Sequence, residues 1–147
     1  MSIFDSFSIN ASGLTAERYR MDVISENIAN IDTTRTEDGT PYRRKLVTFE
    51  EKGKNGTFAS ALAKAKGDYI GGGVRVGKTY EDTETEMKMV YDPSHPDADE
   101  NGYVTYPNVN VITETTDLID ASRSYEANAT AFSASKSMAV KGLEMAQ

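Results

Sequence analysis

The chain of 147 residues contains no cysteine, no tryptophan and a single histidine, His95. Without cysteine, disulfide frameworks, thiolate zinc sites and cysteine nucleophiles are excluded. A single histidine also excludes a metal site that takes two histidines from one chain. These absences remove the commonest metal centres and one class of covalent catalyst, and we expect no cofactor.

Long hydrophobic runs and early positive charge are also missing. No apolar stretch approaches the roughly 18 residues that a membrane span requires, and the first basic residue is Arg18. A cleavable secretory signal needs early basic residues followed by an apolar block. We therefore expect a chain that stays in the cytoplasm or leaves it by a route that uses no such signal.

Positive charge is in the minority, because 16 Lys and Arg stand against 23 Asp and Glu, for a net charge of −7. This balance argues against non-specific binding to nucleic acid or to an anionic membrane surface. The length corresponds to about one domain. The hydrophobic fraction of 38% is low for a globular domain, so we expect a modest core.

The N-terminal segment has the pattern of one long amphipathic helix. Residues 3–31 contain no proline and one glycine, and a polar cluster at residues 30–34 supplies a stop signal. Apolar residues recur in steps of seven at Phe7, Leu14, Met21 and Ile28. A helix of this extent is about 42 Å long.

The C-terminal segment repeats this pattern. Pro107 cannot continue a strand ladder, and Asn110 is suited to cap the helix that follows. The step of seven recurs at Val111, Leu118, Tyr125, Phe132, Ala139 and Ala146. This predicts a helix of about 35 residues, with alanines that allow close approach of another backbone.

The middle of the chain, residues 32–109, reads as a small β-rich insert. Alternating stretches at 42–49, 74–76, 87–89 and 103–106 predict strands, and residues 58–65 predict a short helical turn set. We expect an α+β fold. Its three parts are an N-terminal helix (1–31), the β-rich insert (32–109) and a C-terminal helix (110–147) that pairs with the first as an antiparallel coiled coil.

A single pair of helices buries only one stripe of each helix, and packing is what stabilises such helices. We expect uncovered apolar positions at Ile9, Tyr19, Val23, Met138, Val140 and Leu143. An uncovered stripe of this length exceeds the few hundred Å² that monomers usually expose. Two interpretations stay open: a self-contained helical domain with an insert, and a subunit that completes its core only by assembling.

One acidic stretch resembles a calcium loop. Residues 97–102 place oxygen ligands at the first, third and fifth positions and glycine at the sixth, as in an EF-hand. The twelfth position, which needs a bidentate Glu, is Asn108, and prolines and a strand replace the flanking helices. The stretch favours an acidic turn. A soluble calcium-binding or protein-interaction module that uses this loop is the alternative function.

Other catalytic motifs fail in their context. Residues 72–79 have the spacing of a phosphate loop, but the alternation within them predicts a strand and no helix follows. His95 lies between two prolines, which favours a turn residue over a general base. Ser133 and Lys136 match Ser-x-x-Lys without the companion motifs. We therefore expect no enzyme.

Longer motifs carry a resemblance to a known family. Residues 27–30 (Asn-Ile-Ala-Asn), followed by 41–45 (Pro-Tyr-Arg-Arg-Lys), resemble the N-terminal signature of bacterial flagellar axial proteins. Residues 95–104, 106–110 and 121–128 resemble the proximal-rod proteins of the flagellum. The resemblance covers almost the whole chain. Thr116 and Ala129 depart from it, because similar proteins carry larger apolar residues there.

The resemblance implies a structural subunit of the flagellar basal-body rod, the periplasmic drive shaft that transmits torque to hook and filament. It implies partners among copies of this chain, other rod proteins and basal-body ring components, with no membrane span and no nucleic acid. It also implies synthesis in the cytoplasm and export, without a cleaved signal peptide, by the flagellar type III apparatus.

We expect the assembly interface to lie on the two helical seams. The seam residues are Phe7, Leu14, Met21, Ile28, Leu118, Tyr125 and Phe132, and each large side chain contributes about 1.5–3 kcal/mol when fully buried. Four asparagines, Asn27, Asn30, Asn108 and Asn128, are expected to satisfy backbone groups at helix ends and interfaces. No catalytic, cofactor-binding or metal-ligating residue is expected.

Overall fold

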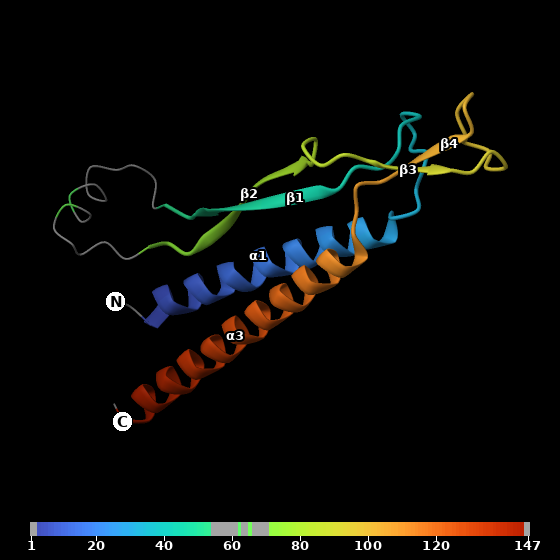
Figure 1. Ribbon diagram of the computed structural model, residues 1–147. Coiled ribbons are helices and arrows are strands. Elements are labelled where there is room, and N and C mark those ends of the chain that lie inside the picture. The colour runs from blue at the N-terminus through green and yellow to red at the C-terminus, as the bar shows by residue number, and fades with distance from the viewer. Residues whose placement is uncertain (1–2, 54–61, 63–64, 66–70, 146–147) are drawn as a thin grey trace. The chain divides into compact units, whose positions relative to one another are not determined.

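The computed structural model describes residues 3–53, 62, 65 and 71–145. Within these residues, two long helices, α1 (Ile3–Ala29) and α3 (Val111–Glu144), flank four strands in chain order (Figure 1). The strands are β1 (Lys45–Glu51), β2 (Val74–Glu81), β3 (Lys88–Tyr91) and β4 (Tyr103–Tyr106). The predicted α+β class with two long helices is confirmed. The helical turn set predicted at residues 58–65 lies largely outside the described residues.

The predicted ends of the helices agree with the hydrogen bonding. Asn110 caps α3, because its Oδ1 accepts the N–H groups of Ile112 at 2.9 Å and of Thr113 at 3.5 Å. At the end of α1, the Nδ2 of Asn30 donates to the carbonyl of Glu26 at 2.9 Å, and its Oδ1 accepts the hydroxyl of Thr33. Polar side chains therefore define the end of α1 and the start of α3.

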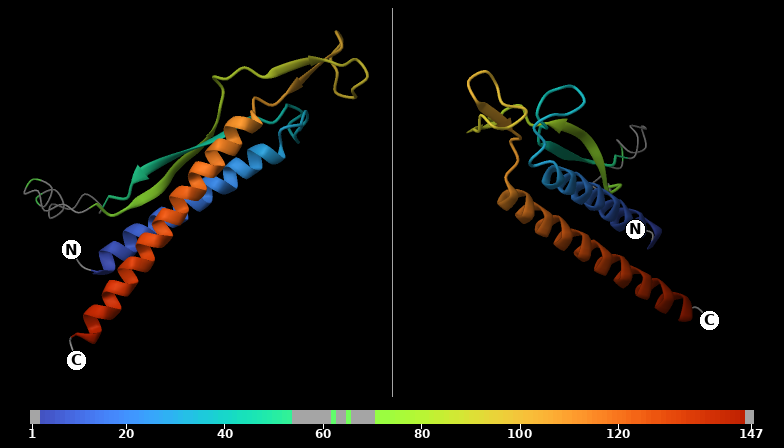
Figure 2. Two further views of the ribbon diagram at one scale, coloured as in Figure 1. Left: turned by 60° about the horizontal axis from the view of Figure 1, so that its bottom comes forward. Right: turned by 90° about the vertical axis from the view of Figure 1, so that its right-hand side faces the viewer.

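The strands form two separate two-stranded sheets. β3 and β4 are antiparallel, with Val90 opposite Val104 and Tyr91 opposite Tyr103, and Figure 2 shows this hairpin from two further sides. β2 contains most of the string that resembles a phosphate loop. Its strand conformation agrees with the prediction that this string is not followed by a helix.

The chain divides into two compact units. We call Met1–Tyr19, Thr48–Gly77 and Ala121–Gln147 the terminal unit, and Arg20–Val47 and Lys78–Asp120 the junction unit. Each helix contributes residues to both units.

The junction unit has a core of apolar and polar side chains together. Its buried apolar residues are Val23, Ile24, Tyr42 and Val104, and its buried polar residues are Asn27, Asp82, Asn108 and Glu114. The prediction that Val23 stays exposed is wrong, because it is 6% exposed. It lies four residues before Asn27, on the buried face of α1.

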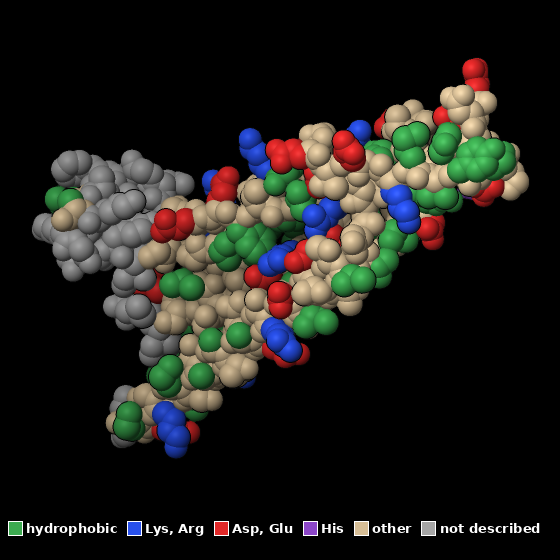
Figure 3. All heavy atoms as spheres, viewed as in Figure 1, with side chains coloured by type: hydrophobic (Ala, Val, Ile, Leu, Met, Phe, Trp, Pro, Cys, Tyr) green, Lys and Arg blue, Asp and Glu red, His purple; other side chains and the backbone are tan. Residues whose placement is uncertain are grey.

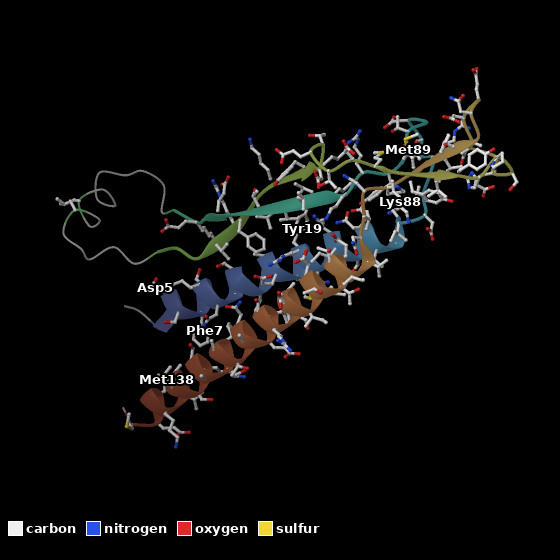
Figure 4. All side chains as sticks on the ribbon, viewed as in Figure 1. Asp5, Phe7, Tyr19, Lys88, Met89 and Met138 are labelled. Atoms are coloured by element: carbon white, nitrogen blue, oxygen red, sulfur yellow. The ribbon has the colours of Figure 1, made fainter. Side chains whose placement is uncertain are left out.

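The terminal unit buries mainly small side chains. Gly13, Ala16, Ala121 and Ser135 are buried, whereas Ile9 is half-buried. Large apolar side chains stay exposed at Tyr19, Met138, Val140 and Leu143, as predicted. Phe7 and Met138 are labelled on their helices in Figure 4.

A glycine fixes the start of β2 within the terminal unit. Gly73 has a φ of 96°, which side chains rarely adopt, and it packs against Ser12 of α1. The Oγ of Ser12 accepts the N–H of Val74 at 3.0 Å. A side chain at position 73 would therefore be strained and would collide with the helix.

Candidate assembly interface and its polar junction

Asn27 is the centre of the junction unit and is 1% exposed. Its Oδ1 accepts the N–H of Lys45 at 2.8 Å and the hydroxyl of Tyr42 at 2.9 Å. Its Nδ2 donates to the carbonyl of Lys45 at 2.9 Å and to Oε2 of Glu114 at 3.0 Å. One amide thus satisfies both backbone groups of Lys45 and links α1 to α3.

Glu114 lies in the first turn of α3 and is 1% exposed. Its Oε1 accepts the Nε–H of Arg44 at 2.6 Å. The Nη2 of Arg44 lies 3.3 Å from Oδ2 of Asp117, and Arg20 of α1 lies 3.8 Å from Oδ1 of Asp117. A carboxylate so deeply buried is tolerated only because both of its oxygens accept hydrogen bonds and a cation neutralises it.

Tyr42 and Lys45 complete the cluster on the segment that leads into β1. Burial raises the pKa of Tyr42 to about 12, with further contributions from the negative charges of Glu26, Glu114 and Glu81. The Nζ of Lys45 lies 2.5 Å from Oε1 of Glu26. The phenol therefore stays neutral, and its hydroxyl donates a hydrogen bond to Oδ1 of Asn27.

Asn108 closes a second set of bonds before α3 begins. Its Oδ1 accepts the N–H of Arg44 at 2.8 Å, and its Nδ2 donates to the carbonyls of Asp82 at 2.9 Å and of Thr85 at 3.2 Å. The N–H and hydroxyl of Thr85 donate to the carboxylate of Asp82 and, with the N–H of Glu84, lower its pKa. This amide joins three segments that are distant in sequence.

The two asparagine-centred sets form one network that we call the polar junction: Asn27, Tyr42, Arg44, Asn108 and Glu114. The network fixes the 42–45 segment against the end of α1 and the start of α3 within the junction unit. Satisfied buried networks specify one arrangement of their segments, because any other arrangement leaves polar groups unpaired. The polar junction therefore sets which residues of the segments meet.

The seam residues of the terminal unit come together in part. The rings of Phe7 and Phe132 make an edge-to-face contact with centroids 5.0 Å apart. A methyl group added at Gly13 would lie 2.9 Å from Oδ1 of Asn128, so that this asparagine packs directly on the glycine. Leu14 and Tyr125 are half-buried. The Nδ2 of Asn128 donates to the carbonyl of Ser124 in its own helix.

The remaining seam residues, Met21, Ile28 and Leu118, are half-buried in the junction unit. None of these seam residues is among the fully buried positions of α1, which among the described residues are Gly13, Ala16, Val23, Ile24 and Asn27. On α3, buried or half-buried residues recur in steps of seven at Glu114, Ala121, Asn128 and Ser135. The apolar seams therefore keep exposed area.

Sequence reasoning missed Arg44 and Glu114 as members of a site. The available signals were the basic run at 43–45 and two carboxylates three residues apart, at Glu114 and Asp117, on one helix face. Those signals indicate charged groups that need partners. They do not identify which of the 23 acidic residues pairs with Arg44.

The acidic stretch at 97–102 uses its carboxylates within the fold. Oδ2 of Asp97 accepts the hydroxyl of Thr34 at 2.8 Å, and Oδ1 of Asp99 accepts the N–H groups of Asn101 and Tyr103. His95 accepts the N–H of Asp97 through Nδ1, as expected of a turn residue. No group of three potential metal ligands lies among the described residues.

Among the residues that the structure describes, neither helix is apolar enough over a sufficient length to cross a bilayer.

Family models match both ends of the chain. The model described as flagella basal body rod protein matches residues 7–35. The model described as flagellar basal body rod FlgEFG protein C-terminal matches residues 100–145. The matched ranges contain most of the polar junction, including Asn27 and Glu114, and most of both helical seams.

Curated relatives match over nearly the full length. The flagellar basal-body rod protein FlgC of Bacillus subtilis is 46% identical, with 99% of each chain covered. FlgC of Borreliella burgdorferi is 45% identical over 100% of this chain and 99% of its own, and FlgC of Salmonella typhimurium is 38% identical over 100% of both. With this identity over its whole length, the chain belongs to the FlgC family of flagellar basal-body rod proteins, whose role is structural and not enzymatic.

Proposed function

We propose that this rod subunit polymerises through the exposed faces of its two helices, with copies of itself and with other rod proteins. The observation that carries the proposal is the contrast within the terminal unit. Small residues such as Ala16 and Ala121 are buried there, whereas Met138 is 66% exposed and Leu143 is 72% exposed. Covering such side chains with neighbouring subunits is favourable, by about 25 cal/mol for each Å² of apolar surface removed from water.

The two helices act as one element, an antiparallel coiled coil of segments 1–31 and 110–147 that is interrupted by the insert 32–109. Two contacts within the terminal unit support an antiparallel order: Phe7 with Phe132, and Gly13 with Asn128. The step of seven in the buried row of α3 supports coiled-coil packing. Small and polar residues occupy this row, and the larger seam residues beside it are only half-buried.

The assembly contacts are assigned to the half-buried seams, with Phe7, Leu14, Met21 and Ile28 on α1 and Leu118, Tyr125 and Phe132 on α3. Asn27, Asn30, Asn108 and Asn128 hold the helices and the insert in the shape that presents these seams. A heterologous contact that does not close on itself generates a helical array. Torque then passes along the array from subunit to subunit.

The subunit reaches the periplasmic rod by the flagellar type III export apparatus, without a cleaved signal peptide, and meets basal-body ring components there. The scarcity of large buried side chains in the terminal unit supports this route. A chain with few large side chains buried along its helix ends is readily kept unfolded for transport and gains its remaining stability on assembly.

The experiment replaces a seam residue and follows the rod. Phe132→Ala removes the ring that contacts Phe7, and Leu118→Asp places a charge on the α3 seam. We expect both variants to be expressed at the normal level and to abolish rod assembly and swimming. The readouts are immunoblots of whole cells and of isolated basal bodies, together with swimming in soft agar.

Phe49→Ala is the matched control, because Phe49 is an aromatic residue of β1 that is 36% exposed and lies outside both seams. We expect this variant to retain assembly. Normal swimming of cells that carry Phe132→Ala or Leu118→Asp would contradict the assignment of the interface to the helical seams.

A further inference from the structure

The β3–β4 hairpin has one buried face and one exposed face. Val104 is fully buried and pairs with Val90 on one face. The other face carries Met89, Tyr91 and Tyr103, which are 62%, 64% and 42% exposed. The rings of Tyr91 and Tyr103 contact each other edge to face, 5.2 Å between centroids. We call these three residues the hairpin patch.

Figure 3 shows hydrophobic side chains gathered over β3 and β4, and Figure 4 labels Met89 on β3. Tyrosine and methionine are enriched in the centres of protein interfaces and are scarce as exposed neighbours elsewhere on surfaces. Three such side chains at adjoining positions of one sheet face therefore indicate a protein-binding surface more strongly than scattered apolar residues do.

The charge around the hairpin patch identifies the kind of partner. Residues 81–103 contain eight of the 23 Asp and Glu but only one of the 16 Lys and Arg, Lys88. This segment therefore carries the whole net charge of −7, and the rest of the chain is balanced. Glu84, Glu86, Asp99 and Glu100 are exposed. The carboxylate of Asp92 accepts the hydroxyl and the N–H of Ser94, which lower its pKa, so it is ionised at neutral pH.

We propose that the hairpin patch docks onto a different protein, one that presents an apolar centre surrounded by Lys and Arg. This inference rests on the proposed function, because it concerns a surface of the assembled subunit. A second copy is a poor occupant, since it would bring an equally acidic hairpin, and Arg44 and Lys45 of its basic run already pair with carboxylates of their own chain. Anionic lipid and nucleic acid are repelled by the same charge.

The test places a photoreactive residue in the hairpin patch of the full chain, in flagellated cells that make only this variant. Tyr91→benzoylphenylalanine is the probe, and Tyr80→benzoylphenylalanine on β2 is the matched control, because Tyr80 is an exposed tyrosine outside the hairpin. Isolated basal bodies are irradiated, and the crosslinked peptides are identified by mass spectrometry. We expect a crosslink from position 91 to another protein, about tenfold stronger than from position 80.

The crosslinked partner must present positive charge to the acidic hairpin. We expect the crosslinked peptide to lie on a surface rich in Lys and Arg, and a Lys→Glu change there to reduce the crosslink. Glu86→Gln combined with Glu100→Gln is expected to reduce the yield about threefold. Glu37→Gln combined with Asp38→Asn, in an exposed turn outside the acidic segment, is expected to leave the yield unchanged.

Three results would overturn the inference. They are crosslinks from position 91 mainly to a second copy of the chain, crosslinks to an acidic or neutral surface, and no crosslink from variants that are incorporated into basal bodies. These results would leave the proposed function intact. Absence of the unmodified chain from isolated basal bodies would instead overturn the proposed function together with the inference.

Discussion

The junction unit and the terminal unit bury different kinds of side chain in their cores. In the junction unit, polar side chains are buried and satisfied, with Asn27 and Glu114 each 1% exposed. In the terminal unit, the buried positions are small residues, and large apolar side chains such as Leu143 remain in solvent. Both units use parts of the same two helices.

The difference teaches where stability depends on the subunit itself and where it depends on neighbours. A satisfied polar network stabilises one arrangement within a single chain. Helix segments that bury only small side chains gain little from each contact, because hydrophobic stabilisation follows the apolar area removed from water. We therefore expect the junction unit to be the stable part of the free subunit.

The largest expected effect tests the network. Glu114→Ala removes the main partner of Arg44 and one of the two acceptors of the Asn27 amide. Breaking a buried ion pair on one side costs about 3–5 kcal/mol, and the second partner of Arg44, Asp117, places the expected loss near the lower figure. Urea unfolding of the purified chain, followed by circular dichroism, measures it.

Glu37→Ala serves as the control for Glu114→Ala, since Glu37 is exposed and its replacement should change the free energy of unfolding by less than about 0.5 kcal/mol. Glu114→Gln should fall between the two, because the amide keeps an acceptor and loses the charge. Equal stability of Glu114→Ala and Glu37→Ala would remove the distinction between the units.

A second prediction compares the two units in one molecule. Backbone amides of α1 and α3 in the terminal unit should exchange with solvent at least about tenfold faster than those in the junction unit, because local opening costs less where few large side chains are buried. Hydrogen exchange of the dilute purified chain, followed by mass spectrometry, provides the measurement.

Assembly should remove this contrast, because neighbouring subunits cover the exposed apolar side chains. Exchange in isolated basal bodies is therefore expected to be slow in both units. Strong protection of both helix ends in the dilute monomer would instead favour a self-contained domain, and the terminal unit would no longer count as the part completed by neighbours.

The smallest expected effect concerns pH. The pKa of Tyr42 is about 12 in the folded chain, against 10.0 without the fold. Between these values the unfolded chain loses its proton first, so stability is fully present below pH 10.0 and falls as the pH rises toward about 12. Tyr42→Phe loses one hydrogen bond, worth about 1 kcal/mol at neutral pH, and lacks this alkaline decline.

The free energies of unfolding of the two chains should therefore converge as the pH is raised, which urea titrations at a neutral and an alkaline pH can measure. Tyr80→Phe is the control, because Tyr80 is 49% exposed and should follow the unmodified chain. A constant difference between the unmodified chain and Tyr42→Phe across this range would show that burial of the phenol is not coupled to folding.

Periodicity and capping residues predicted the elements well. The expected helix at 3–31 is found as Ile3–Ala29, and the Asn110 cap and the strand at 103–106 are present as predicted. The strand expected at 42–49 begins at Lys45. Tyr42 and Arg44 instead bond to the side chains of Asn27 and Asn108. The alternation of apolar residues does not reveal that such side chains replace a neighbouring strand as hydrogen-bond partners.

The buried faces of the helices were harder to predict. Apolar spacing identified Phe7 to Ile28, yet full burial falls on Gly13, Ala16, Val23, Ile24 and Asn27, and three of these residues are small or polar. Val23 was expected to stay uncovered because a single helix pair was expected to bury only one stripe of each helix. Glu114 was not singled out, because a carboxylate is placed inside only when a distant cation and amide accompany it.

The bond between Asn27 and Glu114 joins residues that are 87 positions apart in the chain. If the subunit is exported as an extended chain, this separation delays the formation of the bond. Under the export route proposed above, this bond cannot form until most of the polypeptide has left the channel, whichever terminus leaves first, so the polar junction is completed late in delivery.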